Sequence, residues 1–233
     1  MNNLLPSSLA MVPFVSVENM MRLVNTLGAP KMMAEICKYI EADFRRWPEF
    51  DKTPRVAAHS EEGVIELMPT SDGEFYGFKY VNGHPANMAR GFQTVTAFGV
   101  LANVENGYPV LFSEMTILTA LRTAATSALA AKYLAPKKAR VMGMIGNGAQ
   151  CEFQALAFNE IIGIETVRLY DLDPQATKKA AQNLRNTNLN VVVCKSAEEA
   201  ITGVDIITTC TADKQNATVL TDNMVGSGVH INA

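Results

Sequence analysis

The stretch that decides the fold of this 233-residue chain is Arg140-Val-Met-Gly-Met-Ile-Gly-Asn-Gly-Ala-Gln-Cys151. Its apolar residues predict a strand over 140–145, and the run Glu152 to Ile162 that follows predicts a helix. The glycine turn between them would aim backbone N–H groups and the positive helix end at an anion. The stretch therefore predicts a cradle for a dinucleotide.

The third glycine of the G-x-G-x-x-G pattern is replaced here by Cys151, so the pattern by itself is weak evidence. A second strand, 166–170, ends at Asp171, roughly 25 residues after Gly146. A carboxylate at that place accepts hydrogen bonds from the adenosine ribose and repels a 2′-phosphate, which favours NAD over NADP. The alternative is a glycine turn that closes an ordinary strand–helix junction.

Strands and helices alternate through the C-terminal part of the chain. The sequence predicts strands over 140–145, 166–170, 190–194, 204–209 and 228–232, with helices over 149–162, 174–187 and 196–202. Such alternation is typical of α/β proteins with parallel strands and crossover helices, here a doubly wound Rossmann-type sheet. That fold usually has six strands, so we expect a domain truncated after about five strands.

The N-terminal part has a different pattern. We expect a short strand over 12–15, a helix over 17–27 capped by Ser16, and a longer helix from Pro30 that ends before Pro48. An antiparallel meander is predicted over 55–60, 63–68, 74–82, 92–104 and 108–112, followed by a helix capped by Ser113 that reaches about Leu134. The expected division is an α+β substrate-binding and dimerisation domain over 1–135 and an incomplete NAD-binding domain over 136–233.

Composition excludes several classes of function. Lys plus Arg number 20 against 23 for Asp plus Glu, so no basic face is expected to attract nucleic acid. The four cysteines are widely spaced, which predicts neither a metal site nor a disulfide framework. No apolar run reaches the roughly 18 residues that a membrane helix needs, and no signal peptide is evident. We expect a cytoplasmic protein with reduced thiols.

Three cations lie within otherwise apolar segments. Arg55 and Lys79 fall in predicted strands, where a charge is unfavourable unless it is paired or faces a cleft. Two cations that converge on a cleft would hold a carboxylate, whereas alternate strand positions also face water in ordinary sheets. Arg122 lies in the predicted helix that follows Ser113, where a solvent-facing position on the polar stripe is the alternative.

Five segments of the chain carry a resemblance to known proteins. They are Glu66-Leu-Met-Pro-Thr-Ser-Asp-Gly-Glu-Phe-Tyr-Gly-Phe-Lys-Tyr-Val-Asn-Gly-His-Pro85, Phe92-Gln-Thr-Val-Thr-Ala-Phe-Gly99, Thr119-Ala-Leu-Arg-Thr-Ala-Ala-Thr-Ser127, Ile145-Gly-Asn-Gly-Ala-Gln150 and Asp205-Ile-Ile-Thr-Thr209. The chain thereby resembles the ornithine cyclodeaminase/mu-crystallin family over about residues 12–233. The run Lys79 to Pro85 is similar to the cyclodeaminase branch in particular.

The resemblance implies an NAD-dependent ammonia-lyase reaction without net redox change. In the family's reaction, hydride leaves the α-carbon of L-ornithine for NAD, which gives an imino acid. The δ-amine attacks this imino acid, ammonia departs, and the cyclic imine takes the hydride back to yield L-proline. The resemblance also implies a homodimer joined through the sheet of the substrate domain.

The same resemblance assigns roles to residues by position. Arg55, Lys79 and Arg122 are similar to the residues that bind the substrate carboxylate, and Lys79 is the catalytic candidate among them. Pairing there would place the α-carbon against the nicotinamide. The positions similar to the family's cofactor contacts are Thr94, Arg122, Gly146, Gly148, Ala149, Gln150, Asp171 and Thr211.

The resemblance further implies a catalytic aspartate in a Gly-Gly-Asp segment just after a stretch like His230-Ile-Asn-Ala233, where this sequence stops. If the 233 residues are the complete product, we expect little or no turnover, with NAD binding retained. Two alternatives stay open. One is another enzyme of the family, such as an NAD(P)-dependent imine reductase or amino acid dehydrogenase; the other is a non-catalytic nucleotide-binding protein of the crystallin kind.

Overall fold

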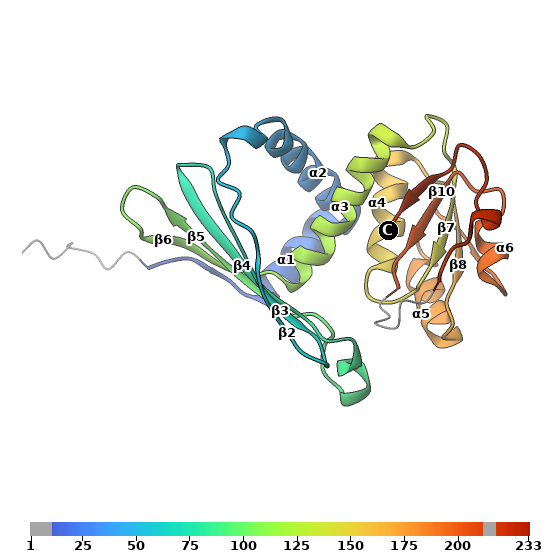
Figure 1. Ribbon diagram of the computed structural model, residues 1–233, viewed down its shortest axis with the longest axis horizontal. Coiled ribbons are helices and arrows are strands. Elements are labelled where there is room, and N and C mark those ends of the chain that lie inside the picture. Colours follow the sequence, from blue (N-terminus) through green and yellow to red (C-terminus); the bar gives the residue numbers. More distant parts are fainter. Residues whose placement is uncertain (1–10, 212–217) are drawn as a thin grey trace, which may run out of the picture. The chain divides into compact units, whose positions relative to one another are not determined.

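The computed structural model describes residues 11–211 and 218–233, and the chain divides into two compact units (Figure 1). The first unit runs to Arg22 and resumes over Arg46–Ile117; the second holds Leu23–Arg45 and Leu118–Ala233. The boundary expected near Ala135, between a substrate-binding and an NAD-binding domain, stays a prediction. By compactness, the two helical segments 29–45 and 118–134 group with the C-terminal strands.

The first unit is built on a six-stranded sheet in the order β1-β6-β5-β4-β3-β2. Its strands are β1 (Phe14–Val15), β2 (Val56–His59), β3 (Val64–Ser71), β4 (Phe75–Gly83), β5 (Ala97–Asn103) and β6 (Pro109–Glu114). Strands β2 to β6 pair antiparallel, which confirms the predicted meander, and β1 pairs parallel with β6. The turn between β3 and β4 forms at Asp72, whose Oδ1 accepts from the backbone N–H groups of Glu74 and Phe75.

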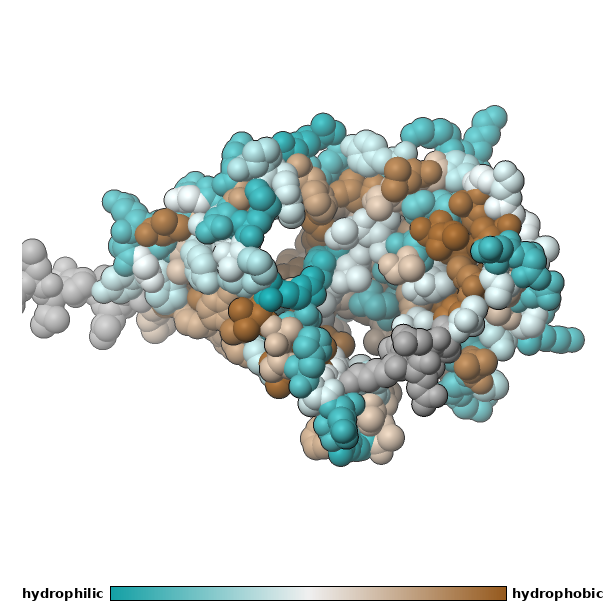
Figure 2. All heavy atoms as spheres, in the orientation of Figure 1, coloured by the Kyte–Doolittle hydropathy of each residue, from teal (hydrophilic) through white to brown (hydrophobic). Residues whose placement is uncertain are grey.

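The two faces of this sheet differ in character. Paired residues of neighbouring strands point to the same side, so the register assigns each side chain to a face. One face is mostly apolar, with Asn82 and Glu114 as polar members, and we call it the aromatic face; it carries Phe14, Val56, Ile65, Leu67, Tyr76, Phe78, Tyr80, Phe98 and Phe112. Many of these side chains are exposed, and Figure 2 shows hydrophobic atoms at the surface of the sheet. The opposite face carries Glu66, Met68, Lys79 and Gly99.

The second unit is built on a five-stranded, all-parallel sheet in the order β11-β10-β7-β8-β9. Its strands are β7 (Val141–Ile145), β8 (Thr166–Tyr170), β9 (Asn190–Val193), β10 (Ile206–Thr209) and β11 (His230–Asn232). The crossover helices are α4 (Cys151–Ile162), α5 (Pro174–Leu184) and α6 (Ala197–Ile201). The strand order reverses between β7 and β10, which confirms the doubly wound fold, and ligands bind at such a switch point.

Helices cover both faces of the parallel sheet, with α4 and α6 on opposite sides (Figure 1). Central strand residues such as Met144, Leu169 and Ile207 are fully buried, as expected for a sheet covered on two faces. Gly143 on β7 allows one helix to approach closely, because a Cβ there would lie 2.5 Å from the carbonyl oxygen of Ala200 on α6. The strands therefore form the core of the second unit.

The remaining helical elements are α1 (Val17–Leu27), α2 (Ala29–Arg45), α3 (Thr116–Leu134) and the short 3-10 helices η1 (Trp47–Glu49), η2 (Pro85–Arg90) and η3 (Asp222–Met224). Ser16 caps α1 as predicted, since its Oγ accepts from Asn19 N at 3.2 Å. The predicted cap of α3 by Ser113 is wrong. Strand β6 continues through Glu114, whose Oε2 accepts from the backbone N–H groups of Thr116 and Ile117 at 2.8 and 3.1 Å.

Candidate functional site

The turn between β7 and α4 begins at Gly146, which is held by the protein's own backbone. Its φ of +91° lies in the left-handed region that favours glycine, and a Cβ there would lie 2.7 Å from the carbonyl carbon of Cys210. Gly146 N donates to the carbonyl oxygen of Tyr170 at 3.0 Å. The turn is therefore fixed between the ends of β8 and β10, at the switch point of the sheet.

Gly148, two residues later, is in a different situation. A Cβ at this position would meet no atom within 4 Å, and its φ is not positive. Neither backbone strain nor protein packing requires glycine here. The open space in front of Gly148 is what a close-approaching phosphate would use, because the second glycine of such turns lets a pyrophosphate reach the backbone.

Helix α4 begins without the side-chain cap that its neighbours have. Its N-cap residue, Gln150, makes no capping hydrogen bond, whereas Asp173 caps α5 by accepting from Gln175 N at 2.9 Å and Ser196 caps α6. Oε1 of Gln150 is also buried without a hydrogen-bond partner. Helix N-termini of this kind bind anions through their backbone N–H groups and the helix dipole.

Asp171 follows β8 and is fixed against the turn. Its Oδ2 accepts from Asn147 N at 2.5 Å, and its Oδ1 accepts from Asp173 N at 2.8 Å. Each carboxylate oxygen keeps a further lone pair for a ligand hydroxyl. The structure thus places Gly146, Gly148, Gln150 and Asp171 side by side, as the cradle requires.

Asn147 supports the turn from inside, although no sequence pattern singled it out. Its side chain is fully buried, and Oδ1 accepts from Oγ1 of Thr177 on α5 at 2.9 Å. Its Nδ2 donates to the Cys151 sulfur at 3.6 Å. Burial raises the pKa of the Cys151 thiol, and it raises that of Cys210 to about 11, so both cysteines stay protonated at neutral pH.

These residues fit an NAD molecule. The turn offers uncapped amides and open space for the pyrophosphate, Asp171 offers a carboxylate for the ribose, and exposed Thr211 follows the end of β10.

Within residues 11–211 and 218–233, no group of three metal-ligating side chains occurs and no helix is long and apolar enough to cross a membrane. A cavity of about 500 Å³ in the second unit is lined by none of the predicted site residues.

In the first unit, the structure brings two of the three predicted substrate residues to one face of the sheet. Lys79 on β4 pairs in register with Met68 and Gly99, so it points away from the aromatic face. Arg55, just before β2, places Nη1 3.1 Å from Oε1 of Glu66 on that same face. The sequence pattern did not single out Glu66, because its pairing depends on the strand register.

Arg122 and Thr94 lie on other elements. Arg122 is exposed on α3 in the second unit, and its carbonyl oxygen accepts from Oγ1 of Thr126 at 2.8 Å. Thr94 lies in the loop after η2 in the first unit, where its carbonyl oxygen accepts from His84 N at 2.9 Å. Asn82 secures this loop, since its Oδ1 accepts from Thr96 N at 2.7 Å. The residues expected to bind substrate and cofactor thus come from both units.

Comparison with known proteins adds evidence of descent. Residues 17–233 match the ornithine cyclodeaminase/mu-crystallin family. Ornithine cyclodeaminase of Brucella suis biovar 1 (strain 1330) is 69% identical over 226 residues, which are 97% of this chain and 63% of that enzyme. The chain therefore spans less than two thirds of the length of this curated relative.

Two solved structures share the fold along nearly the whole chain. One is a lysine cyclodeaminase, described with recognition of L-lysine, L-ornithine and L-2,4-diaminobutyric acid; its TM-score is 0.87 and its identity 27%, over 95% of this chain and 67% of that one. The other is an archaeal alanine dehydrogenase dimer with bound NAD; its TM-score is 0.81 and its identity 31%, over the same shares of the two chains.

Proposed function

The chain belongs to the ornithine cyclodeaminase/mu-crystallin family, and from that premise we propose that it serves the NAD-dependent conversion of L-ornithine to L-proline and ammonia. The single observation that carries the proposal is the cradle at Gly146–Gln150 with Asp171 beside it. The 69% identity to an ornithine cyclodeaminase supports ornithine over other amino acids. NAD supplies the acceptor and donor of the hydride at the substrate's α-carbon.

Several residues of the chain would hold NAD. The backbone of Ala149 and Gln150 faces the pyrophosphate, and Gly148 leaves the room it needs. Asp171 accepts from the ribose hydroxyls and disfavours a 2′-phosphate. Thr94, Arg122 and Thr211 are the further cofactor contacts that we propose. The solved dehydrogenase, which binds NAD and shares the fold, supports this placement.

The substrate carboxylate would be held by cations. Arg55 and Lys79 lie on the face of the sheet opposite the aromatic face, and Arg122 on α3 is the third cation that the family resemblance assigns to the carboxylate. Glu66 keeps the Arg55 guanidinium oriented. Lys79 is the residue we assign to catalysis, because an ammonium beside the reacting carbon holds or moves a proton there.

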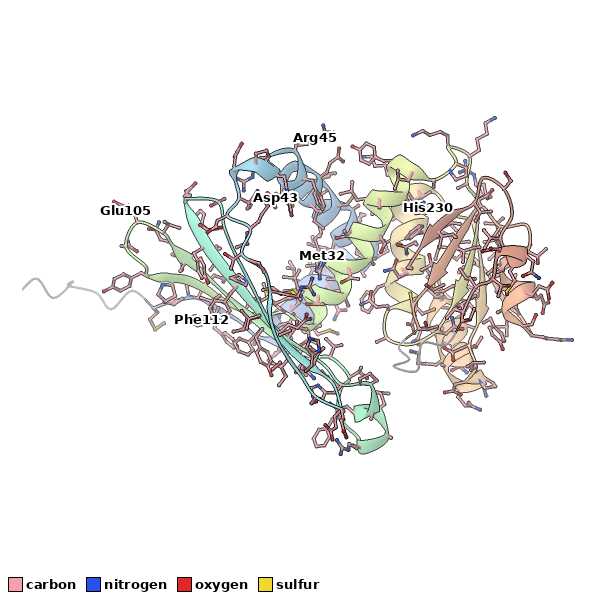
Figure 3. All side chains as sticks on the ribbon, in the orientation of Figure 1. Met32, Asp43, Arg45, Glu105, Phe112 and His230 are labelled. Carbon is pink, nitrogen blue, oxygen red and sulfur yellow. The ribbon has the colours of Figure 1, made fainter. Side chains whose placement is uncertain are left out.

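We propose further that the protein is a homodimer joined through the aromatic face. Phe14, Phe98 and Phe112 are 66%, 50% and 38% exposed although they pair across neighbouring strands, and Figure 3 labels Phe112 on this sheet. A contiguous apolar face of this kind usually marks an interface. The solved alanine dehydrogenase, described as a dimer, supports a dimeric state.

A second candidate function is the net oxidation of an amino acid, or the net reduction of an imine, at the same site. The 31% identity to an alanine dehydrogenase favours it, because such an enzyme needs the same cradle without a cyclising step. Net production or consumption of NADH with alanine or a cyclic imine would identify it. Binding of NAD without turnover of any such substrate would instead favour the non-catalytic alternative.

The test is formation of proline and ammonia from L-ornithine with catalytic NAD. It is run on this chain and on this chain joined to the C-terminal part of the Brucella suis enzyme, since the chain spans 63% of that relative. We expect proline from the joined protein, with deuterium at the α-carbon of ornithine retained in the product. A joined protein that is folded and binds NAD but forms no proline would refute the cyclodeaminase assignment.

A further inference from the structure

A buried polar network lies inside the second unit, next to the nucleotide turn. Gln154, one turn into α4, is only 3% exposed. Its Nε2 donates to Oγ of Ser127 on α3 at 3.2 Å, and its Oε1 accepts from Nδ2 of Asn232 on β11 at 3.5 Å. A single amide therefore connects two helices and a strand.

The network continues into the centre of the sheet. Asn232 Nδ2 also donates to Oγ1 of Thr208 on β10 at 3.3 Å, and Thr208 is fully buried. Oγ1 of Thr208 donates in turn to the sulfur of Met142 on β7 at 3.8 Å. Leaving a buried polar atom without its partner costs about 1–3 kcal/mol, so the members of the network constrain one another.

The position of Gln154 connects the two halves of the proposed cofactor site. It lies four residues after Gln150, the N-cap of α4, while Ser127 lies five residues after Arg122 on α3. Around Ser127, the buried residues of α3 include three alanines and two leucines, namely Ala124, Ala125, Ala128, Leu121 and Leu129. Hydrogen bonds from Lys132 and Tyr133 to Glu41 on α2 hold the C-terminal end of α3, whereas the bond from Gln154 to Ser127 holds the helix nearer to Arg122.

We infer that Gln154 is a positioning residue: through Ser127 it determines where α3 holds Arg122 relative to the turn at Gly146–Gln150. The inference rests on the proposed function in that NAD binds at this turn with Arg122 near it. Removing the amide leaves the turn itself intact, because the turn is held by contacts of Gly146 and Asp171. NAD binding therefore survives, weakened only by the contact that Arg122 loses.

The test is modification of Arg122 by phenylglyoxal in the full chain, measured by peptide mass spectrometry with and without saturating NAD. In the unsubstituted chain, NAD is expected to slow modification of Arg122 about tenfold; in Gln154→Leu and Ser127→Ala the slowing falls below about threefold. The NAD dissociation constant, measured by calorimetry, rises no more than about tenfold in both variants, as expected for the loss of one polar contact. Arg22 and Arg45, both largely exposed, serve as internal references.

The matched control is Asn159→Ala, which removes a hydrogen bond of 2.7 Å from Nδ2 to the carbonyl oxygen of Ile164 at the far end of α4. It lowers stability without contacting α3, and the protection of Arg122 should survive it. Protection that survives in Gln154→Leu and Ser127→Ala, or that is lost in Asn159→Ala as well, would overturn the inference. NAD binding without protection in the unsubstituted chain overturns it too, whereas absence of NAD binding refutes the proposed cofactor site itself.

Discussion

The two sheets of this protein present their functional groups in different ways. In the second unit, the parallel strands β7 and β10 are buried on both faces and β8 on one, and the candidate site consists of the backbone that follows these strands. In the first unit, the meander keeps one exposed aromatic face, and the candidate site consists of side chains on the other. The site in the second unit is formed by backbone turns. The site in the first unit is formed by side chains that the strand register brings to one face.

The difference determines how each site responds to change. A backbone site is local, because a few residues such as Gly146 and Gly148 set the φ angle and the free space that a ligand needs. A side-chain site draws on several strands, so Arg55, Glu66 and Lys79 share one face of the sheet only if every register between them is right. Substitutions should therefore separate cofactor binding from chemistry.

The largest effect is expected at Lys79. We predict that Lys79→Met in the joined protein lowers the rate of proline formation about a hundredfold to a thousandfold, because a group that positions the carboxylate and handles a proton is lost. The NAD dissociation constant should not change, since the cofactor turn lies in the other unit. Lys31→Met on α2 is the control and should retain full activity.

The next effect is at Gly146. We predict that Gly146→Ala destabilises the protein by about 2–5 kcal/mol and abolishes NAD binding, because the new Cβ meets the backbone at Cys210 in a left-handed conformation. Thermal unfolding and calorimetric titration measure the two consequences. An alanine variant with normal stability would show that this turn is not held by the close approach described above.

The aromatic face provides a test of the first unit by itself. We predict that Phe98→Asp converts a dimer into a monomer, since a charge at the centre of an apolar interface costs about 2 kcal/mol or more. Sedimentation velocity reports the change. Tyr39→Asp, on an exposed aromatic residue of α2, is the control and should stay dimeric. A dimer that survives Phe98→Asp would place the interface elsewhere.

Gly148→Ala sharpens the contrast within the second unit. Because a Cβ at Gly148 meets no protein atom within 4 Å, the free energy of unfolding should change by less than about 1 kcal/mol. NAD affinity should fall about tenfold, since the methyl group occupies the space next to the pyrophosphate. Equal losses of stability and affinity would contradict this division of roles between the two glycines.

The smallest effect concerns side chains of the second unit. Hydrogen bonds from Lys132, Tyr133 and Arg45 lower the pKa of Glu41 to about 2. The folded-state pKa lies below the unfolded value, so the stabilisation is complete above about pH 5 and disappears as the pH falls towards 2. We predict that the gap in melting temperature between the wild-type protein and Glu41→Gln closes over that range. A difference in melting temperature that does not change with pH would contradict the assigned stabilisation by Glu41.

Much of the fold could be predicted from sequence because its signals are local. The alternation of strands and helices gives the five parallel strands, and the spacing from Gly146 to Asp171 gives the cradle. The cap of α3 was mispredicted because Ser113 resembles a cap, while β6 continues one residue further to Glu114. A cap depends on where the preceding strand ends, which the local pattern does not fix.

The candidate site was only partly predictable. Asn147 and Gln154 were missed, since a buried amide within a turn or helix has no periodic pattern of its own. Glu66 was missed because its contact with Arg55 follows from strand pairing. For Arg55 and Lys79 the pattern left open both a carboxylate site and ordinary exposed strand charges, and the family resemblance favoured the site, whereas the turn and Asp171 follow from elementary geometry.

The most direct measurement is a calorimetric titration of the full chain with NAD and, separately, with NADP. The backbone cradle and the Asp171 carboxylate predict one site per chain, with NAD bound at least about tenfold more tightly than NADP. Absence of NAD binding to the folded chain, or NADP binding as tight as that of NAD, would contradict the placement of the cofactor on this turn.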